Sequence, residues 1–101
     1  MAMNPMQQML ANAQRMQREL QKAHAALAEK EFHVSKGGMV ELTMLGDRSV
    51  KELVIDKDAL DPENAEMLSD TIALALNEAL EAIGKEYDEI EERITGKTGL
   101  F

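Results

Sequence analysis

The sequence predicts an α+β fold in which a small antiparallel sheet is flanked along the chain by two long helices. Residues 31–55 alternate apolar and polar side chains and are divided by glycine-containing turns, a pattern typical of a three-stranded antiparallel meander. The stretches on either side repeat apolar residues every three or four positions, which favours amphipathic helices. We therefore expect one domain over residues 1–101, with strands at about residues 31–35, 39–45 and 49–55.

The first helix is expected over residues 5–29. Asn4 carries a good N-cap side chain, and Pro5 suits the first helical position. At 1.5 Å per residue this helix would be about 37 Å long. Its apolar residues are spaced alternately by three and four, which makes a heptad seam typical of a helix that lies along a partner. They are Met6, Met9, Ala13, Met16, Leu20, Ala23 and Leu27.

The second helix is expected over residues 62–95, after a short turn at residues 58–60. Asp61 and Pro62 repeat the start signal of the first helix, and Gly96 is expected to end the second one. A helix of that length would extend for about 50 Å. Residues 96–101 are then expected to form a loose tail.

Helices of this length predict that one copy of the chain is not a closed globule. A compact domain of this size has a radius of gyration near 13 Å, so the outer parts of both helices must project as an antiparallel pair. A three-stranded sheet also leaves edges and apolar surface to cover. We therefore expect a homodimer built across the sheets, with helical arms pointing outward. The residues expected in its core or dimer interface are Val40, Leu42, Met44, Val50, Leu53 and Ile55.

The first helix also carries a candidate binding surface for a polyanion. The chain has a net charge of -8, but residues 1–50 hold six Lys/Arg and five Asp/Glu, whereas residues 51–101 hold five and fourteen. Arg15, Arg18 and Lys22 are spaced by three and four and fall within about 60° of one another, nearly opposite the seam. This basic stripe suits contacts to phosphates. Lys, Arg and Gln also fill the solvent-facing side of most helices, so an ordinary exposed face explains the same pattern.

Composition argues against several other classes of protein. The chain has no Cys, so disulfides and zinc–thiolate sites are excluded. His24 and His33 have no third ligand at metal spacing, so we expect them to be ordinary surface or sheet-face residues. No nucleophile lies beside a base and no glycine loop precedes a helix, so we expect neither an enzyme nor a cofactor. No apolar run approaches the roughly 20 residues of a membrane helix, and no signal peptide is evident. A cytoplasmic protein without a membrane partner is the default expectation.

The order of these segments resembles a known family. The chain contains QRMQRELQKA in the first helix, GGMVELTMLGD and VKELVID in the sheet, and EMLSDTIALALNEALEA in the second helix. In order and spacing it resembles the YbaB/EbfC family of bacterial nucleoid-associated proteins over almost its whole length. The resemblance implies an α-β-β-β-α protomer, a tweezer-like homodimer and binding of double-stranded DNA by the projecting helices. It implies DNA contacts at Arg15, Arg18 and Lys22, with Lys85 and Arg93 as the basic positions of the second helix.

Two functions follow from these observations. The first is a dimeric nucleoid-associated protein that binds double-stranded DNA with low sequence preference and contributes to nucleoid organisation, gene expression or DNA protection. The second is a dimeric protein-interaction or chaperone-like adaptor, whose Met-rich seam holds other proteins. The net charge of -8 suits this adaptor, which would not bind DNA strongly, better than it suits DNA binding, and the second helix, with eleven acidic and two basic residues over 61–95, would repel DNA.

Overall fold

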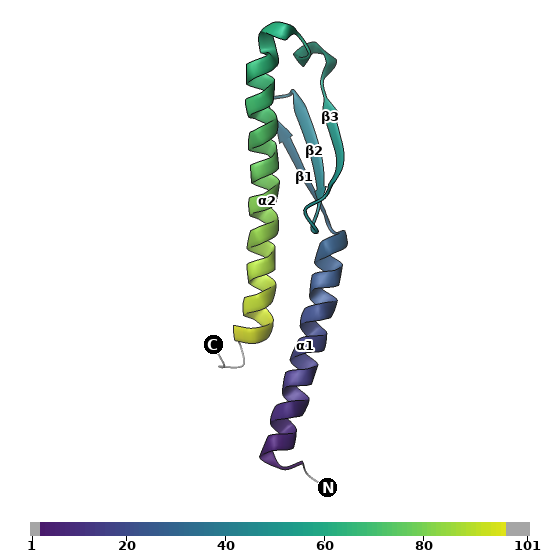
Figure 1. The fold of residues 1–101 in the computed structure, drawn as a ribbon, viewed down its shortest axis with the longest axis vertical. Helices are drawn as coiled ribbons and strands as arrows, with labels where there is room; N and C mark the ends of the chain where they lie inside the picture. Colours follow the sequence, from purple (N-terminus) through teal and green to yellow (C-terminus); the bar gives the residue numbers. More distant parts are fainter. Residues whose placement is uncertain (1–2, 97–101) are drawn as a thin grey trace.

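In the computed structural model, which describes residues 3–96, a three-stranded antiparallel sheet is preceded and followed by a long helix (Figure 1). The elements are α1 (Pro5–Glu29), β1 (Glu31–Lys36), β2 (Val40–Leu45), β3 (Val50–Ile55), the 3₁₀ turns η1 (Lys57–Ala59) and η2 (Pro62–Asn64), and α2 (Ala65–Thr95). This order confirms the predicted α+β fold. The predicted tail beyond Gly96 lies outside the described residues.

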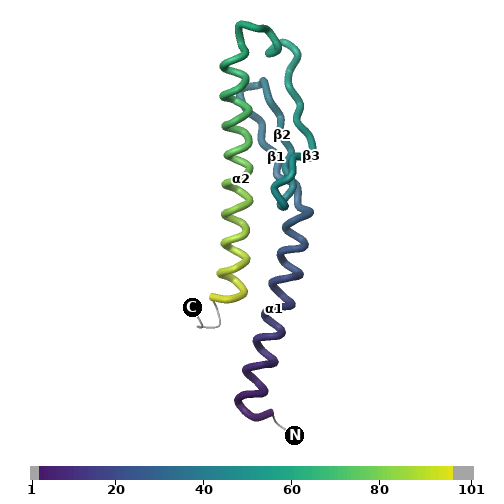
Figure 2. Tube along the Cα trace, in the orientation of Figure 1, coloured from purple at the N-terminus to yellow at the C-terminus, as the bar shows by residue number. Residues whose placement is uncertain are grey.

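The protomer is a long rod rather than a globule. It measures 74 × 21 × 14 Å and has a radius of gyration of 20.4 Å, well above the roughly 13 Å of a compact domain of this length. The two helices run antiparallel, and the N-terminal part of α1 continues past the C-terminal end of α2 (Figures 1 and 2). The outer part of α1 therefore projects alone, whereas the prediction had the outer parts of both helices projecting as a pair.

Helix α1 begins at the capping signal visible in the sequence. The Asn4 side-chain oxygen accepts a hydrogen bond from the Gln7 backbone N–H at 2.7 Å. The Gln7 side-chain oxygen accepts one from the Asn4 backbone N–H at 3.1 Å. Pro5, which has no N–H to satisfy, occupies the first turn. This reciprocal capping box satisfies two backbone donors, so the exposed end of the arm is held in helical form.

The sheet has the order β1-β2-β3, and both pairs are antiparallel. The β1–β2 hairpin closes through Gly37 and Gly38, whose φ angles of 59° and 68° are left-handed, and the Met39 N–H donates to the Lys36 carbonyl at 3.0 Å. Two consecutive positive φ values define a type I′ turn, whose twist matches that of the strands. The hairpin thus fixes which residues of β1 and β2 share a face.

The β2–β3 turn packs against the end of α1. The Gly46 N–H donates to the Lys30 carbonyl at 2.9 Å, and the Asp47 N–H donates to the Ala28 carbonyl at 3.2 Å. A Cβ atom on Gly46 would lie 1.7 Å from the carbonyl oxygen of Leu27, so only glycine fits. Hydrogen bonds from Ser49 lower the pKa of the Asp47 carboxyl. The turn therefore caps the last carbonyls of α1 and joins that helix to the sheet.

The core lies between α2 and one face of the sheet, mainly over β1 and β2. Its buried residues are Val34, Val40, Leu42, Met44, Ala75, Ala79 and Ile83. The predicted set of core or interface residues divides here. Val40, Leu42 and Met44 are buried within the protomer, Ile55 is half-buried, and Val50 and Leu53 remain 48% and 42% exposed. The difference arises because β3 is an edge strand that α2 does not cover.

The ends of α2 differ slightly from the prediction. Residues 62–64 form the 3₁₀ turn η2, so the α-helix begins at Ala65 rather than Pro62. The cap signal at Asp61 is used, because its side chain accepts a hydrogen bond from the Glu63 N–H at 3.0 Å, but it caps the tighter turn. Gly96 follows the helix with a φ of −65°, not the left-handed value of a glycine stop signal.

The two helix-associated glycines, Gly46 and Gly84, provide a matched test of the fold. Replacing Gly46 with Ala should cost about 3 kcal/mol in the free energy of unfolding, because the new methyl group meets rigid backbone. Gly84 lies inside α2, and an added Cβ there has nothing within 4 Å. Gly84→Ala should therefore stabilise the protein by about 0.5–1 kcal/mol through helix propensity. Urea unfolding of both variants measures this, and equal effects would contradict the close contact at Gly46.

Candidate nucleic-acid interface

The candidate DNA-binding residues lie on the outer side of α1. Arg15, Arg18 and Lys22 are all exposed, whereas Leu27, which faces α2, is buried. At 100° per residue the three cations lie on the side of α1 away from Leu27. The stripe lies on α1, whose N-terminal part extends past the end of α2 (Figure 1), rather than on the sheet.

The charges of the stripe are not neutralised by any other residue in the described part of the chain. Among residues 3–96, none of the three cations forms an ion pair, and Arg15 makes only a long side-chain hydrogen bond of 3.4 Å to Asn12. Lysines beside the sheet behave differently. Lys36 pairs with Glu78, and Lys51 pairs with Glu31 at 2.8 Å. The hydrogen bond and charge of Glu31 raise the pKa of Lys51. The cations of the stripe thus remain available to an anionic partner.

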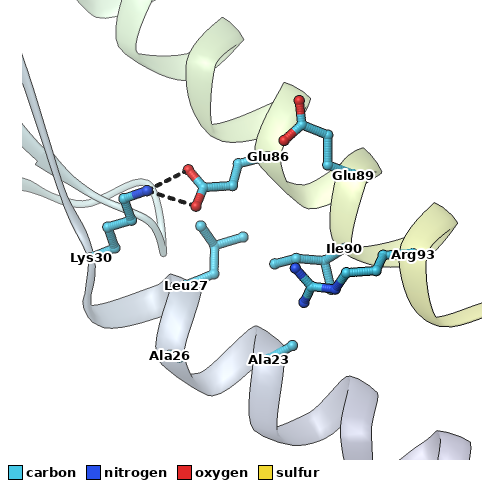
Figure 3. Close-up of a pocket in the computed structure, with 8 residues that line it drawn as sticks. All are labelled: Ala23, Ala26, Leu27, Lys30, Glu86, Glu89, Ile90 and Arg93. Carbon is cyan, nitrogen blue, oxygen red and sulfur yellow. Dashed lines mark hydrogen bonds and ion pairs between the residues drawn. The ribbon is translucent and has the colours of Figure 1, made fainter.

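An apolar contact and an ion pair hold the root of the arm against α2. Leu27 of α1 and Ile90 of α2 are both buried and line a small pocket of about 270 Å³ between the helices (Figure 3). Beside it, the Lys30 ammonium donates to both carboxylate oxygens of Glu86, at 2.7 and 2.9 Å. The same ammonium lies 5.3 Å from the centre of the Phe32 ring. These contacts set the position of α1 relative to α2.

His24 and Tyr87 form a second contact between the helices. Their rings stack with centroids 4.7 Å apart and planes within 4° of parallel, and His24 Nε2 lies 3.0 Å from Glu91 Oε1. The expectation of an ordinary surface residue is therefore wrong for His24, which is half-buried between α1 and α2. It holds for His33, which is exposed on the sheet and lies 3.2 Å from the Thr43 hydroxyl. Sequence spacing alone did not reveal the stacking because the two helices are distant in the chain.

A groove of about 700 Å³ opens where α2 ends beside the projecting arm. Met9, Met16 and Ile94 supply apolar lining, while Arg15 and Arg93 supply positive charge and Glu19 supplies one negative charge. Arg93 thus lines the same groove as Arg15, although the two are far apart in sequence. Their proximity follows from the antiparallel helix pair, but locating it needs the axial register of the helices, which the sequence pattern does not give. Lys85, the other basic position of α2, is exposed and does not line this groove.

The acidic residues of α2 lie on more than one side of the helix. Glu86 contacts Lys30, which follows α1, and Glu91 contacts His24 of α1, whereas others point away from it. Glu81, Asp88 and Glu92 are exposed and recur at spacings of seven and four. Helical rotation places them nearly opposite Ile90, which contacts α1. The acidic side of α2 and the basic stripe of α1 therefore point in different directions from the helix pair.

In the part of the chain that is described, neither helix combines the length and hydropathy of a membrane span.

Comparison with known proteins identifies the family to which this chain belongs. Residues 3–98 match the model of the YbaB/EbfC DNA-binding family. A nucleoid-associated protein of Enterococcus faecalis is 45% identical over 87 residues, covering 85% of this chain and 84% of its own length. A nucleoid-associated protein of Metamycoplasma arthritidis is 40% identical, covering 85% of this chain and 90% of its own. One from Ruminiclostridium cellulolyticum is 35% identical over 101 residues, covering 95% and 88%. The chain belongs to the YbaB/EbfC DNA-binding family.

Proposed function

We propose that this chain is a nucleoid-associated protein that binds double-stranded DNA as a homodimer, with low sequence preference, in the nucleoid of the cytoplasm. Its role there is nucleoid organisation, gene expression or DNA protection. The family and the names of the relatives support DNA binding. The observation that carries the proposed site is the exposed, unpaired stripe of Arg15, Arg18 and Lys22 on an arm that projects from an acidic protein.

The chemistry of the stripe favours contacts to the DNA backbone. Arginine and lysine side chains spaced along a helix neutralise phosphates and release counterions, and such contacts carry little sequence information. Arg93, which shares the groove with Arg15, adds a cation from α2. Two copies double the number of contacts along one duplex. The acidic side of α2 repels DNA, and this restricts the orientation in which the duplex approaches the arm.

The exposed edge of the sheet supports the homodimer. Strand β3 has no neighbour on its outer side among the described residues, and its Val50, Leu53 and Val54 are all exposed. An apolar edge strand of this kind is a template for pairing with another chain. Val40, Leu42 and Met44 are already buried under α2, so the interface we propose uses β3 and leaves those three residues in the protomer core.

Replacing all three stripe residues with Ala should strongly weaken DNA binding. With about six phosphate contacts per dimer, wild-type affinity should fall roughly 10³-fold between about 50 and 200 mM salt, and the triple variant should lose both affinity and most of that salt dependence. Gel shifts or fluorescence anisotropy across a salt series measure this. Unchanged affinity in the triple variant would remove Arg15, Arg18 and Lys22 as the DNA site.

A matched pair of single substitutions controls for net charge. Arg18→Ala and Lys57→Ala each remove one exposed cation, but Lys57 lies in η1 at the sheet end of the molecule. The salt slope should decrease by about two for Arg18→Ala, one contact per protomer, and remain unchanged for Lys57→Ala. Equal effects would indicate general charge rather than a site. Absence of DNA binding in the wild type, with nuclease-resistant capture of proteins, would favour the adaptor function.

The dimer is tested at the exposed edge strand. Leu53→Lys should convert the dimer to a folded monomer, because it places a charge in the proposed interface without disturbing the buried core. Leu74→Lys, at a similarly exposed leucine on α2, should leave the mass unchanged. Sedimentation equilibrium gives both masses, and circular dichroism checks folding. Dissociation by Leu74→Lys alone would place the interface on the helix layer instead.

A further inference from the structure

The free end of the arm differs chemically from the rest of the chain. Charged residues make up 30% of the sequence, yet the first charged residue is Arg15. The described part of this segment, residues 3–14, presents large apolar side chains to solvent. Met6 and Met9 are 72% and 71% exposed, and Leu10 is 59% exposed. We call residues 3–14 the uncharged tip. Exposed apolar residues gathered in this way mark an interaction surface.

The chain's described residues do not cover the tip. The seam of α1 packs on α2 through Leu27 and Ala23, and it continues at the same heptad spacing to the exposed Met9 and Met6. The N-terminal part of α1 extends past the end of α2 (Figure 1). A seam held over three repeats suits a helical partner along its whole length. The covered half of the seam has α2 as that partner, and the exposed half has none among residues 3–96.

Electrostatics selects the kind of partner. The tip has no cation to attract phosphates, so the DNA proposed for the stripe has no reason to extend over it. A charged protein surface gains no ion pairs there. A second copy of this chain, with a net charge of -8, is repelled along its acidic helix, but residues 3–14 of two copies meet without repulsion between side chains, because neither segment has a charged side chain. The tip is therefore the part of the arm where two copies approach at the lowest electrostatic cost.

The geometry beside the tip is self-complementary. The groove at the end of α2 has an apolar lining from Met9, Met16 and Ile94, is also lined by the charged Arg15, Glu19 and Arg93, and opens beside the helix that carries the tip. If two α1 helices lie antiparallel, the tip of each enters the groove of the other, and both exposed seams are covered at once. Such a reciprocal contact closes as a two-fold pair and leaves no unmatched surface.

We infer that the uncharged tip binds the tip of a second copy as an antiparallel helix pair, with each tip in the groove beside Ile94 of the other. This contact is separate from the sheet-edge dimer, and it shares one residue, Arg15, with the basic stripe. It joins dimers end to end, so the assembly carries several basic stripes instead of one pair. The methionines suit this contact because their flexible side chains adapt to a partner surface.

The first experiment compares assembly of two triple variants. Met6→Gln, Met9→Gln and Leu10→Gln together remove the apolar surface of the tip without adding charge. The control combines Leu60→Gln, Met67→Gln and Leu74→Gln, at residues that are 60–61% exposed elsewhere. Sedimentation velocity over a concentration series should show a mass step above the dimer for wild type and control. The tip variant should shift that step to at least about tenfold higher concentration.

Three outcomes of that series would overturn the inference. They are a wild type with no step above the dimer, an unchanged step in the tip variant, and equal loss in the control. Removal of residues 97–101 provides a further discrimination. If those residues occupy the groove in place of a second copy, their removal should create or enlarge the step, whereas the tip-to-tip contact leaves it unchanged. Sedimentation is measured without DNA, which separates this test from that of the stripe.

The second experiment detects the contact directly. The chain has no Cys, so Met9→Cys provides one thiol per copy, and a bismaleimide of about 10 Å spans two packed helices. Any product linking two such chains is intermolecular. It should form with Met9→Cys, persist when Leu53→Lys disrupts the sheet edge, and be absent with the control Asn77→Cys on the exposed side of α2. Loss of the product together with the sheet-edge dimer would show that the tips have no contact of their own.

Discussion

The backbone contact between the β2–β3 turn and the end of α1 is the constraint on which the shape of this protein depends. Helix α1 does not pack over the sheet. Its direction is set by the hydrogen bonds from Gly46 and Asp47 to the carbonyls of Lys30 and Ala28. Carbonyls at a helix end need partners, and here the turn supplies them in place of water. Because the turn and the helix end are fixed to each other, α1 leaves the sheet as an arm in one defined direction.

Helix α2 makes that direction stable by serving two packing partners with one continuous element. Its first part covers the sheet through Ala75, Ala79 and Ile83, and its later part meets α1 through Ile90. The stacked rings of His24 and Tyr87 and the Lys30–Glu86 ion pair flank this apolar contact. Since one rigid helix touches both the sheet and the root of the arm, the basic stripe and the acidic side of α2 are held at a fixed angle to each other.

Much of the architecture was predictable because it depends on local chemistry. The seam of α1 gives its length, Asn4 and Pro5 give its start, and the paired glycines 37 and 38 give a tight hairpin. The exposed stripe also follows from helical periodicity alone. The sequence could not predict how the elements pack against one another. Alternation shows that Leu42 and Leu53 share a face, but not that α2 covers only one of them. Likewise, Arg93 beside Arg15 depends on how far the antiparallel helices slide past each other.

Because α1 is attached at its C-terminal end, its length can change without changing the sheet. Each added residue lengthens an α-helix by 1.5 Å and turns it by 100°, so seven residues extend it by about 10 Å and bring nearly the same side round again. Near Pro5 such an insertion changes only the length of the arm. A single residue inserted between Lys22 and the C-terminal end of α1 would rotate all three cations of the stripe by about 100° around the helix axis. Insertions near Pro5 therefore change how far the arm reaches, whereas insertions near Lys30 change the direction in which its cations point.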